Sequence, residues 1–225
     1  HLLSITLKEM GIAVMLNTPI KGITKNGHWQ LSTGDTALID ADALILATGG
    51  RAAHHLGSTG DGLYWAERMG HGLTPIFPAL VPVVTEEGWT KDAQGVKVDV
   101  LIDAKCGGQV IASGNGDLIF TNYGVSGPAV MAISGRIAPY IGKALVELYI
   151  DLFPDVGIDG LMEHIRYVTA NHPSMKVADI LTGMIPDKLI PIVFMLSDID
   201  GDLLADDLRD GRWFHLLGTL KALRL

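Results

Sequence analysis

Two glycine-rich segments of this chain have the composition of ligand-binding loops. Residues 47–50 read Ala-Thr-Gly-Gly, and residues 57–62 read Gly-Ser-Thr-Gly-Asp-Gly. Glycine has no Cβ, so a ligand can approach the backbone closely at these positions. The free N–H groups of a helix start, expected directly after the second segment, attract anionic or polar ligand atoms. The candidate binding residues are Ala47, Thr48, Gly49, Gly50, Gly57, Thr59, Gly60, Asp61 and Gly62.

Simpler interpretations of both segments stay open. Residues 47–50 are also typical of a plain strand followed by a flexible turn, and Asp61 is a common type of helix cap. The glycine spacing of residues 57–62 matches a phosphate-binding P-loop, but Leu63 and Tyr64 stand where that loop requires Lys and Ser or Thr. Nucleoside triphosphate hydrolysis at this loop is therefore excluded. The chain contains no Gly-x-Gly-x-x-Gly motif.

A third segment, Gly-Val-Ser-Gly-Pro at residues 124–128, nearly matches the nucleophile elbow of serine hydrolases. Pro128 replaces the last glycine of that motif, which lets strand and helix pack closely. Proline instead suits the first turn of a helix that Ser126 or Gly127 would cap. A hydrolase with Ser126 as its nucleophile is therefore the weaker alternative.

No metal site is predicted. Asp198, Asp200 and Asp202 imitate the start of a calcium-binding loop, but Leu203 and Arg209 occupy the positions of its required Gly and Glu. The chain also has a single cysteine and no spaced set of histidines and carboxylates, which a zinc site needs.

The composition is typical of a packed protein that does not bind nucleic acid. Hydrophobic residues make up 48% and charged residues 19%, which excludes a disordered chain. The formal net charge is −8 and no basic run is present, whereas a nucleic-acid surface needs clustered Lys and Arg. The apolar runs are too short to span a bilayer, and the only cysteine, Cys106, suits a reducing cytosol. We expect a cytoplasmic protein with a small-molecule substrate and no nucleic-acid or membrane partner.

Hydrophobic periodicity and turn residues predict the elements that position these segments. The Asn26-Gly27 pair between two alternating runs predicts a hairpin, and the apolar run 41–47 indicates a buried strand. In the first third of the chain we expect a helix at 2–10, a strand at 12–16, a meander over 18–39, a strand at 41–47 and a helix at 63–69. From 73 to 153 the pattern is strand-like, interrupted by a helix at 128–137, and further helices are expected at 161–170, 177–184, 187–196 and 212–223.

Two long motifs together resemble a known family. Residues 41–82 contain, in order, the apolar strand, both glycine segments, a helix ending in Gly-His, and Pro-x-x-Pro-Ala-Leu-Val-Pro. Residues 116–129 read Gly-Asp-Leu-Ile-Phe-Thr-Asn-Tyr-Gly-Val-Ser-Gly-Pro-Ala. In this order and spacing the chain resembles, over essentially its whole length, bacterial FAD-binding flavoproteins of the aminoacetone-oxidase-like or bile-acid-oxidoreductase-like type.

The resemblance implies an α+β chain. Residues 1–74 would form the edge of a two-dinucleotide-binding-type FAD domain, with its β-meander, and residues 75–225 an insert. In the insert, a β-barrel would take about 75–155 and 197–225, and a helical subdomain about 156–196. The Gly-x-Gly-x-x-Gly segment of such proteins lies before this part of the sequence. The chain is therefore expected to be a central fragment that holds FAD weakly or not at all.

The resemblance also implies a function for the full-length parent. It would be an FAD-dependent oxidoreductase, with NAD(P)H as a candidate electron donor, and the insert would cover the flavin and shape the substrate pocket. Candidate pocket residues are Asn122, Tyr123 and Ser126. No catalytic residue is assigned, because the chain has Ala52-Ala53-His54 where the family has a Ser-Tyr-Pro-type stretch, and Asn122 where His is common. The alternative function is an interaction or regulatory module without catalysis.

Overall fold

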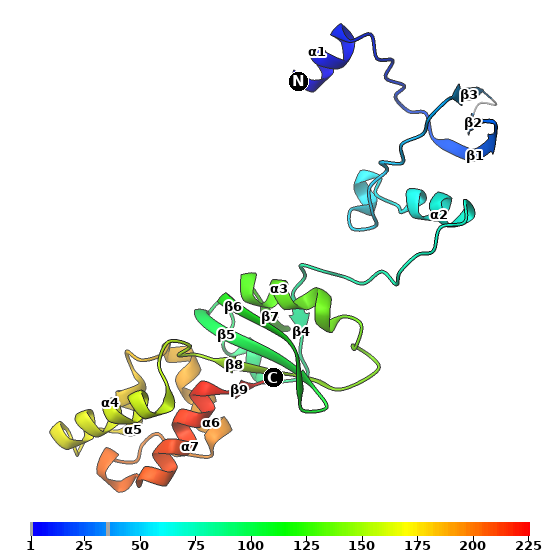
Figure 1. Ribbon diagram of the computed structural model, residues 1–225. Coiled ribbons are helices and arrows are strands. Elements are labelled where there is room, and N and C mark those ends of the chain that lie inside the picture. The colour runs from blue at the N-terminus through cyan, green and yellow to red at the C-terminus, as the bar shows by residue number, and fades with distance from the viewer. Residues whose placement is uncertain (1, 35–36) are drawn as a thin grey trace. The chain divides into compact units, whose positions relative to one another are not determined.

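The computed structural model describes residues 2–34 and 37–225. The chain divides into two compact units, His1–Pro75 and Ile76–Leu225 (Figure 1). Within the described ranges, none of the helices has both the length and the apolar character that crossing a membrane requires.

The first unit is built around a three-stranded antiparallel meander. β1 (Ile20–Asn26), β2 (His28–Thr33) and β3 (Leu38–Ala41) pair in this order, so the predicted meander is confirmed. The hairpin between β1 and β2 turns at Gly27, whose φ of 79° is a left-handed angle that favours glycine. The helical elements of this unit are α1 (Leu2–Glu9), the short η1 (His54–Leu56) and α2 (Asp61–Arg68).

Two predicted strands of the first unit are wrong. Residues 12–16 form no strand, and of the run 41–47 only Ala41 belongs to one, β3. Ile45 is 88% exposed instead of buried. A strand requires hydrogen bonds to a neighbouring strand, and in residues 2–34 and 37–225 no further strand lies beside this run. Its apolar composition alone therefore does not make it a strand.

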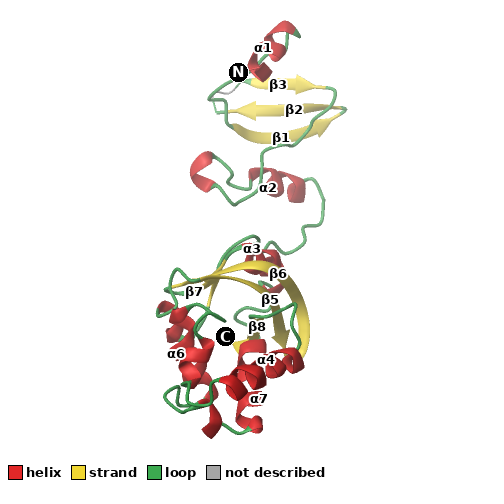
Figure 2. Cartoon of the chain, turned by 90° about the vertical axis from the view of Figure 1, so that its left-hand side faces the viewer, coloured by secondary structure: helices red, strands yellow, loops and turns green. Residues whose placement is uncertain are grey.

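The second unit folds around a curved, six-stranded antiparallel sheet that forms a half-barrel (Figure 2). The strands lie in the order β4-β7-β6-β5-β8-β9. The helix α3 (Pro128–Ile137) packs on β6, and a Cβ on Gly114 of that strand would lie only 2.6 Å from the Ala129 carbonyl oxygen. Glycine at 114 thus lets α3 approach the sheet. The strands are β4 (Val83–Val84), β5 (Lys97–Cys106), β6 (Gln109–Thr121), β7 (Gly124–Ser126), β8 (Val146–Asp151) and β9 (Leu223–Arg224).

Apart from α3 and η2, the helical elements of the second unit follow β8. The predicted helix at 128–137 is confirmed at both ends, and the later predicted helices are found with bounds shifted by a few residues. α7 matches the predicted helix at 212–223, with Leu216, Leu217 and Leu220 fully buried at helical spacing. It lies within the residues 197–225 that the resemblance assigns to the barrel, of which only β9 pairs with the sheet. The helical elements are η2 (Gly88–Lys91), α4 (Ile158–Asn171), α5 (Val177–Leu181), η3 (Asp187–Leu189), α6 (Ile190–Ser197), η4 (Ala205–Asp207) and α7 (Asp210–Lys221).

The Pro-Ala-Leu-Val-Pro motif docks on α3. Ser134 of this helix is only 2% exposed; its hydroxyl accepts a hydrogen bond from the Val81 N–H at 3.2 Å and donates to the Met131 carbonyl at 2.8 Å. One residue further along, a Cβ on Gly135 would lie 3.1 Å from the Ala79 Cβ. Glycine at 135 thus allows the motif to pack closely on α3. This contact fixes the position of the chain just before β4.

Candidate functional site

The two glycine segments of the first unit fold against each other. The loop that joins them contains η1, which is followed by Gly57 with a φ of 93°. The Gly57 N–H donates to the His54 carbonyl at 3.0 Å, and the Ser58 N–H donates to the Ala53 carbonyl at 3.1 Å. This tight turn reverses the chain, and it brings residues 57–62 back beside residues 48–51.

Three contacts across this loop explain three of its glycines. A Cβ on Gly62 would collide with the Thr48 hydroxyl, and a Cβ on Gly60 would lie 2.7 Å from the Arg51 Nε. A Cβ on Gly49 would lie 3.1 Å from the Ser58 Oγ. The structure therefore brings most of the predicted binding residues together. It also shows that side chains of one segment pack on glycines of the other, a reason for glycine that needs no ligand.

Left-handed backbone angles are a second reason for glycine at two of these positions. Gly49 has a φ of 78° and Gly60 a φ of 89°, and side-chain-bearing residues rarely adopt such angles. Gly50 and Gly57 have open space where a Cβ would stand. At these two positions a side chain would meet no neighbouring atom, and both residues are exposed. Ala47, Thr48 and Thr59 are exposed at the same loop.

The start of α2 is uncapped by any side chain. Gly60 is the N-cap residue, and its carbonyl accepts the Leu63 and Tyr64 N–H groups at 3.0 and 3.2 Å. The interpretation of Asp61 as the capping residue is therefore wrong; Asp61 is the first residue of the helix, with an exposed side chain. A helix start of this kind offers backbone N–H donors and a partial positive charge to an anionic group.

Arg51 is the residue of this loop that the sequence analysis misses. Its side chain lies over Gly60, directly beside the start of α2. A guanidinium presents several N–H donors in a planar fork that matches phosphate geometry. The available signal was an arginine immediately after the Gly-Gly pair, in a loop already suspected of binding an anion.

The predicted pocket residues of the second unit lie on the β6–β7 turn and on β7. Asn122 and Tyr123 are exposed in the turn, with Tyr123 at 46%. The Tyr123 carbonyl accepts the Thr85 N–H at 3.1 Å, which ties the turn to the end of β4. Ser126 is half-buried and lies opposite Ile119 in the sheet.

The glycines around Ser126 serve the backbone packing of the half-barrel. A Cβ on Gly124 would collide with the Val83 carbonyl oxygen, and a Cβ on Gly127 would lie 2.5 Å from the Asp117 carbonyl oxygen. Pro128 opens α3 as its first residue, as predicted. Within residues 2–34 and 37–225 no hydrogen bond joins Ser126 to a histidine, and the histidines of this unit lie at 164, 172 and 215, on or beside α4 and α7. The nucleophile–base pair of a serine hydrolase is not assembled.

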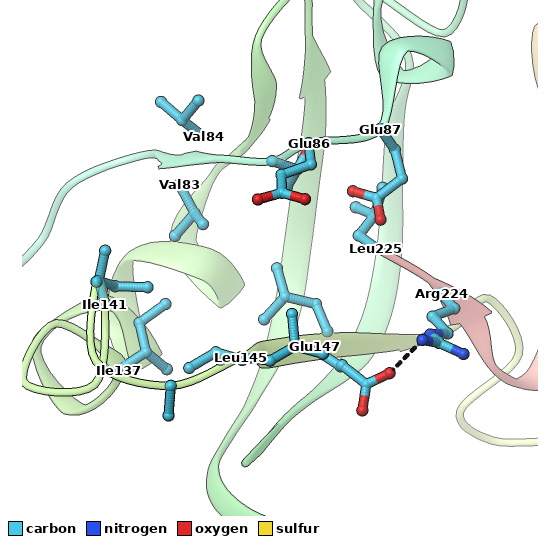
Figure 3. A pocket seen from close by; sticks show the side chains of 15 residues that line it. Val83, Val84, Glu86, Glu87, Ile137, Ile141, Leu145, Glu147, Arg224 and Leu225 are labelled. Carbon is cyan, nitrogen blue, oxygen red and sulfur yellow. Dashed lines mark ion pairs between the residues drawn. The ribbon is translucent and has the colours of Figure 1, made fainter. Parts of the chain in front are cut away.

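A cavity of about 250 Å³ lies at the open side of the half-barrel, and Asn122, Tyr123 and Ser126 are not among the residues that line it (Figure 3). It is lined by residues of β4, β8 and β9 and by the end of α3. Among the described residues no group of three or more His, Cys, Asp or Glu is placed to hold a metal ion.

Comparisons with known proteins agree with these motifs. A family model described as "HI0933-like protein barrel and H2TH domain" matches residues 77–225. The chain is 31% identical over 223 residues to the 3-dehydro-bile acid delta(4,6)-reductase of Clostridium scindens, an alignment that covers 98% of this chain and 54% of that protein.

Two relatives are named for a different activity. The chain is 30% identical over 165 residues to the ribosomal RNA dihydrouridine synthase of Haemophilus influenzae, covering 72% of this chain and 38% of that protein. It is 30% identical over 186 residues to the Escherichia coli protein of the same name, covering 81% and 43%. The chain thus spans about half the length, or less, of the curated relatives it matches.

Proposed function

The chain belongs to the HI0933-like family, and on that premise we propose that it is the central part of a cytoplasmic, FAD-dependent oxidoreductase. The observation that carries the proposal is the folded loop of the first unit. It places the uncapped start of α2, the Arg51 guanidinium and the exposed residues Gly50 and Gly57 together. These are the features that hold the diphosphate of a dinucleotide. One relative is named a reductase, and the other two are named for making dihydrouridine, the reduced form of uridine; both names describe reductions, which supports redox chemistry.

The residues present fit a dinucleotide in specific roles. The backbone at Thr48, Gly49 and Gly50 would contact FAD, and the start of α2 from Gly60 to Gly62 would face its charged part. When bound, the flavin supplies the electron transfer, with NAD(P)H as the proposed donor, while the protein supplies position and polarity. The second unit, as the insert, would cover the flavin and shape the substrate pocket. The β6–β7 turn and β7 would contribute to it through Asn122, Tyr123 and Ser126.

We propose a small-molecule substrate for this protein rather than ribosomal RNA. Of the 25 acidic and 17 basic residues of the chain, 19 acidic and 12 basic residues lie in Ile76–Leu225, a formal charge of −7. RNA carries one negative charge per phosphate, and proteins bind it by neutralising phosphates with Lys and Arg. An insert of this charge repels an RNA backbone. The bile-acid reductase, which aligns with almost the whole chain, supports a small organic substrate.

Flavin content of loop variants in the longer parent tests the cofactor role. Gly49→Ala places a side chain at a φ of 78° beside Ser58, a strain of about 1–3 kcal/mol. We expect the free loop to relax and relieve this strain, so that restoring the binding conformation weakens flavin binding roughly 5- to 150-fold. The matched control is Gly108→Ala, which has a φ of 79° and nothing within 4 Å, at the β5–β6 turn of the other unit.

Bound flavin per polypeptide is measured after gel filtration, with circular dichroism to establish folding. Gly49→Ala is expected to lose most of its flavin, and Gly108→Ala to keep it. Full flavin content in Gly49→Ala would overturn the role of this loop. A second variant, Arg51→Gln, removes the guanidinium without backbone strain and is expected to weaken flavin binding while the protein stays folded.

A further inference from the structure

The helix α6 is apolar along its whole length but only partly covered. Its residues, Ile190–Ser197, include no charged side chain. Ile192 and Val193 are buried in the core of the second unit. Met195 and Leu196, by contrast, are 58% and 37% exposed. Because a helix that is apolar on every face is normally covered on every face, the exposed part of α6 is a candidate interaction surface.

An open groove of about 710 Å³ lies beside this exposed part of the helix, and we call it the α6 groove. One wall is apolar and comes from α6, and the other comes from the loop that follows α6 and from α7, which lies next to α6 (Figure 1). The lining residues are Pro191, Phe194, Met195, Asp198, Ile199, Asp200, Gly201 and Arg212.

The loop that forms the second wall is fixed by its own packing. A Cβ on Gly201 would lie 2.6 Å from the Phe194 ring, so glycine at this position lets the ring pack on the loop. The Gly201 carbonyl accepts the Ala178 N–H at 3.0 Å. The Leu203 carbonyl accepts the Val177 N–H at 2.9 Å. A partner therefore meets a surface that is already formed, which lowers the entropic cost of binding.

This loop is also strongly acidic. Residues 198–207 contain five aspartates and no Lys or Arg. Lys176 neutralises one of them, Asp202, in an ion pair. The Arg212 guanidinium donates to the Asp198 backbone carbonyl. Across residues 2–34 and 37–225, no cationic side chain forms an ion pair with the Asp198 or Asp200 carboxylate, so both are available to a partner.

The position of these carboxylates favours a cationic partner. A helix ends in a partial negative charge, which basic residues usually balance. The last turn of α6 contains no basic residue, and Asp198 stands at its C-cap with a left-handed φ of 51°. In the described part of the chain these aspartates do not converge with a third acidic group to hold a metal ion. Lysine or arginine side chains of another molecule would balance this charge.

We propose that the α6 groove binds an amphipathic segment of a partner protein that carries apolar side chains together with lysines or arginines. The apolar side chains would cover Met195, whose flexible thioether adapts to different shapes, and would contact the Phe194 ring. The cationic side chains would pair with the carboxylates of the loop. Nucleic acid and an anionic membrane surface do not fit, because the aspartates repel phosphate. A second copy of this chain carries the same formal charge of −8 and is repelled as well.

A synthetic peptide tests the proposal on the 225-residue chain, without reference to flavin. The probe is a fluorescein-labelled helix of about five turns, with Leu along one face and Lys on the others. The control peptide has the same composition in scrambled order, so it keeps the charge and loses the apolar face. By fluorescence anisotropy we expect the amphipathic peptide to bind roughly tenfold more tightly than the scrambled one, and more weakly as salt is raised.

Two variants locate the binding, each with a matched control. Met195→Gln removes apolar surface and is expected to weaken binding roughly tenfold, whereas Met10→Gln, at an exposed methionine of the first unit, leaves it unchanged. Asp198→Asn removes one charge with a residue type that tolerates the left-handed angle, and roughly 3- to 5-fold weaker binding is expected. Its control is Glu163→Gln, which removes an exposed carboxylate on α4.

Circular dichroism establishes that each variant is folded, and the Met195 methyl NMR signal should shift on peptide addition while that of Met10 does not. Equal binding of the scrambled peptide would mean that charge alone attracts it and that the α6 groove has no role. Unchanged affinity in Met195→Gln, or no binding tighter than about 100 μM, overturns the proposal. A dimeric mass that Met195→Gln converts to a monomer would mean that a second copy covers α6 instead.

Discussion

Lys221 makes a contact whose removal should destabilise the second unit strongly. Its ammonium lies 2.7 Å from a carboxylate oxygen of Asp151, and it also donates to the carbonyl oxygens of Phe153 and Val156 at 2.6 and 2.7 Å. The other Asp151 oxygen accepts the Phe153 N–H at 2.9 Å. Lys221, the last residue of α7, thus connects this helix to the end of β8 and to the loop that follows β8.

The size of the effect follows from burial. The Lys221 and Asp151 side chains are only 20% and 16% exposed, and breaking a buried pair by removing one partner costs about 3–5 kcal/mol. Because some water reaches this pair, we expect Lys221→Met to lower the free energy of unfolding by about 2–3 kcal/mol. The matched control is Lys97→Met, in a pair with Asp117 whose side chains are 59% and 41% exposed, where about 0–1 kcal/mol is expected.

Urea unfolding followed by tryptophan fluorescence measures both values. A Trp29→Phe, Trp65→Phe background leaves Trp89 and Trp213 as reporters, and both lie in the second unit. The double variant Asp151→Asn, Lys221→Met should recover part of the loss, since no unpaired carboxylate is left behind. If Lys221→Met were as stable as Lys97→Met, the Lys221–Asp151 pair would contribute no more than an exposed ion pair, and the reasoning from its burial would be refuted.

Three further predictions concern the Thr85 hydroxyl at the cavity of the half-barrel, a surface ion pair and cofactor affinity. Thr85→Val should raise the free energy of unfolding of the 225-residue chain by about 1 kcal/mol in a denaturant titration, because it removes a buried hydroxyl with no partner; a loss of stability would mean that the hydroxyl has one. The hydrogen bond from Lys176 lowers the pKa of the Asp202 carboxyl, so its contribution to stability is present above the unfolded pKa and lost as pH falls through the folded pKa. Lys176→Gln should raise the pKa of Asp202 toward its ordinary value in an NMR titration, and an unchanged pKa would contradict the pairing. The 225-residue chain should bind FAD no more tightly than roughly 1 μM by flavin fluorescence, and a tighter dissociation constant would show that these 225 residues suffice to form the site.

Local signals in the sequence predict the local structure well. The helix at Pro128–Ile137 is found with both predicted ends, because proline sets the first turn and Gly127 supplies the left-handed angle before it. The hairpin at Asn26-Gly27 follows from the same kind of information, a residue pair that favours one turn. In both cases the decisive interactions span only a few residues.

Features that depend on distant partners could not be predicted. The apolar run 41–47 has the composition of a buried strand, but pairing decides whether it becomes one. The role of the glycines at 60 and 62 as cofactor contacts stays a prediction, but the packing of Arg51 and Thr48 against them could not be predicted. These contacts arise because the chain reverses direction at η1, and no local sequence pattern predicts this reversal. The family, in contrast, could be identified from motif order, and the match over residues 77–225 supports that identification.

The absorbance spectrum of the purified longer parent tests the central claim most directly. The protein is expected to show a flavin spectrum, to release stoichiometric FAD on denaturation, and to bleach anaerobically when a reduced nicotinamide is added. A well-folded parent that purifies without flavin, and takes up none when FAD is supplied, would contradict the assignment of this chain to a flavin-dependent oxidoreductase.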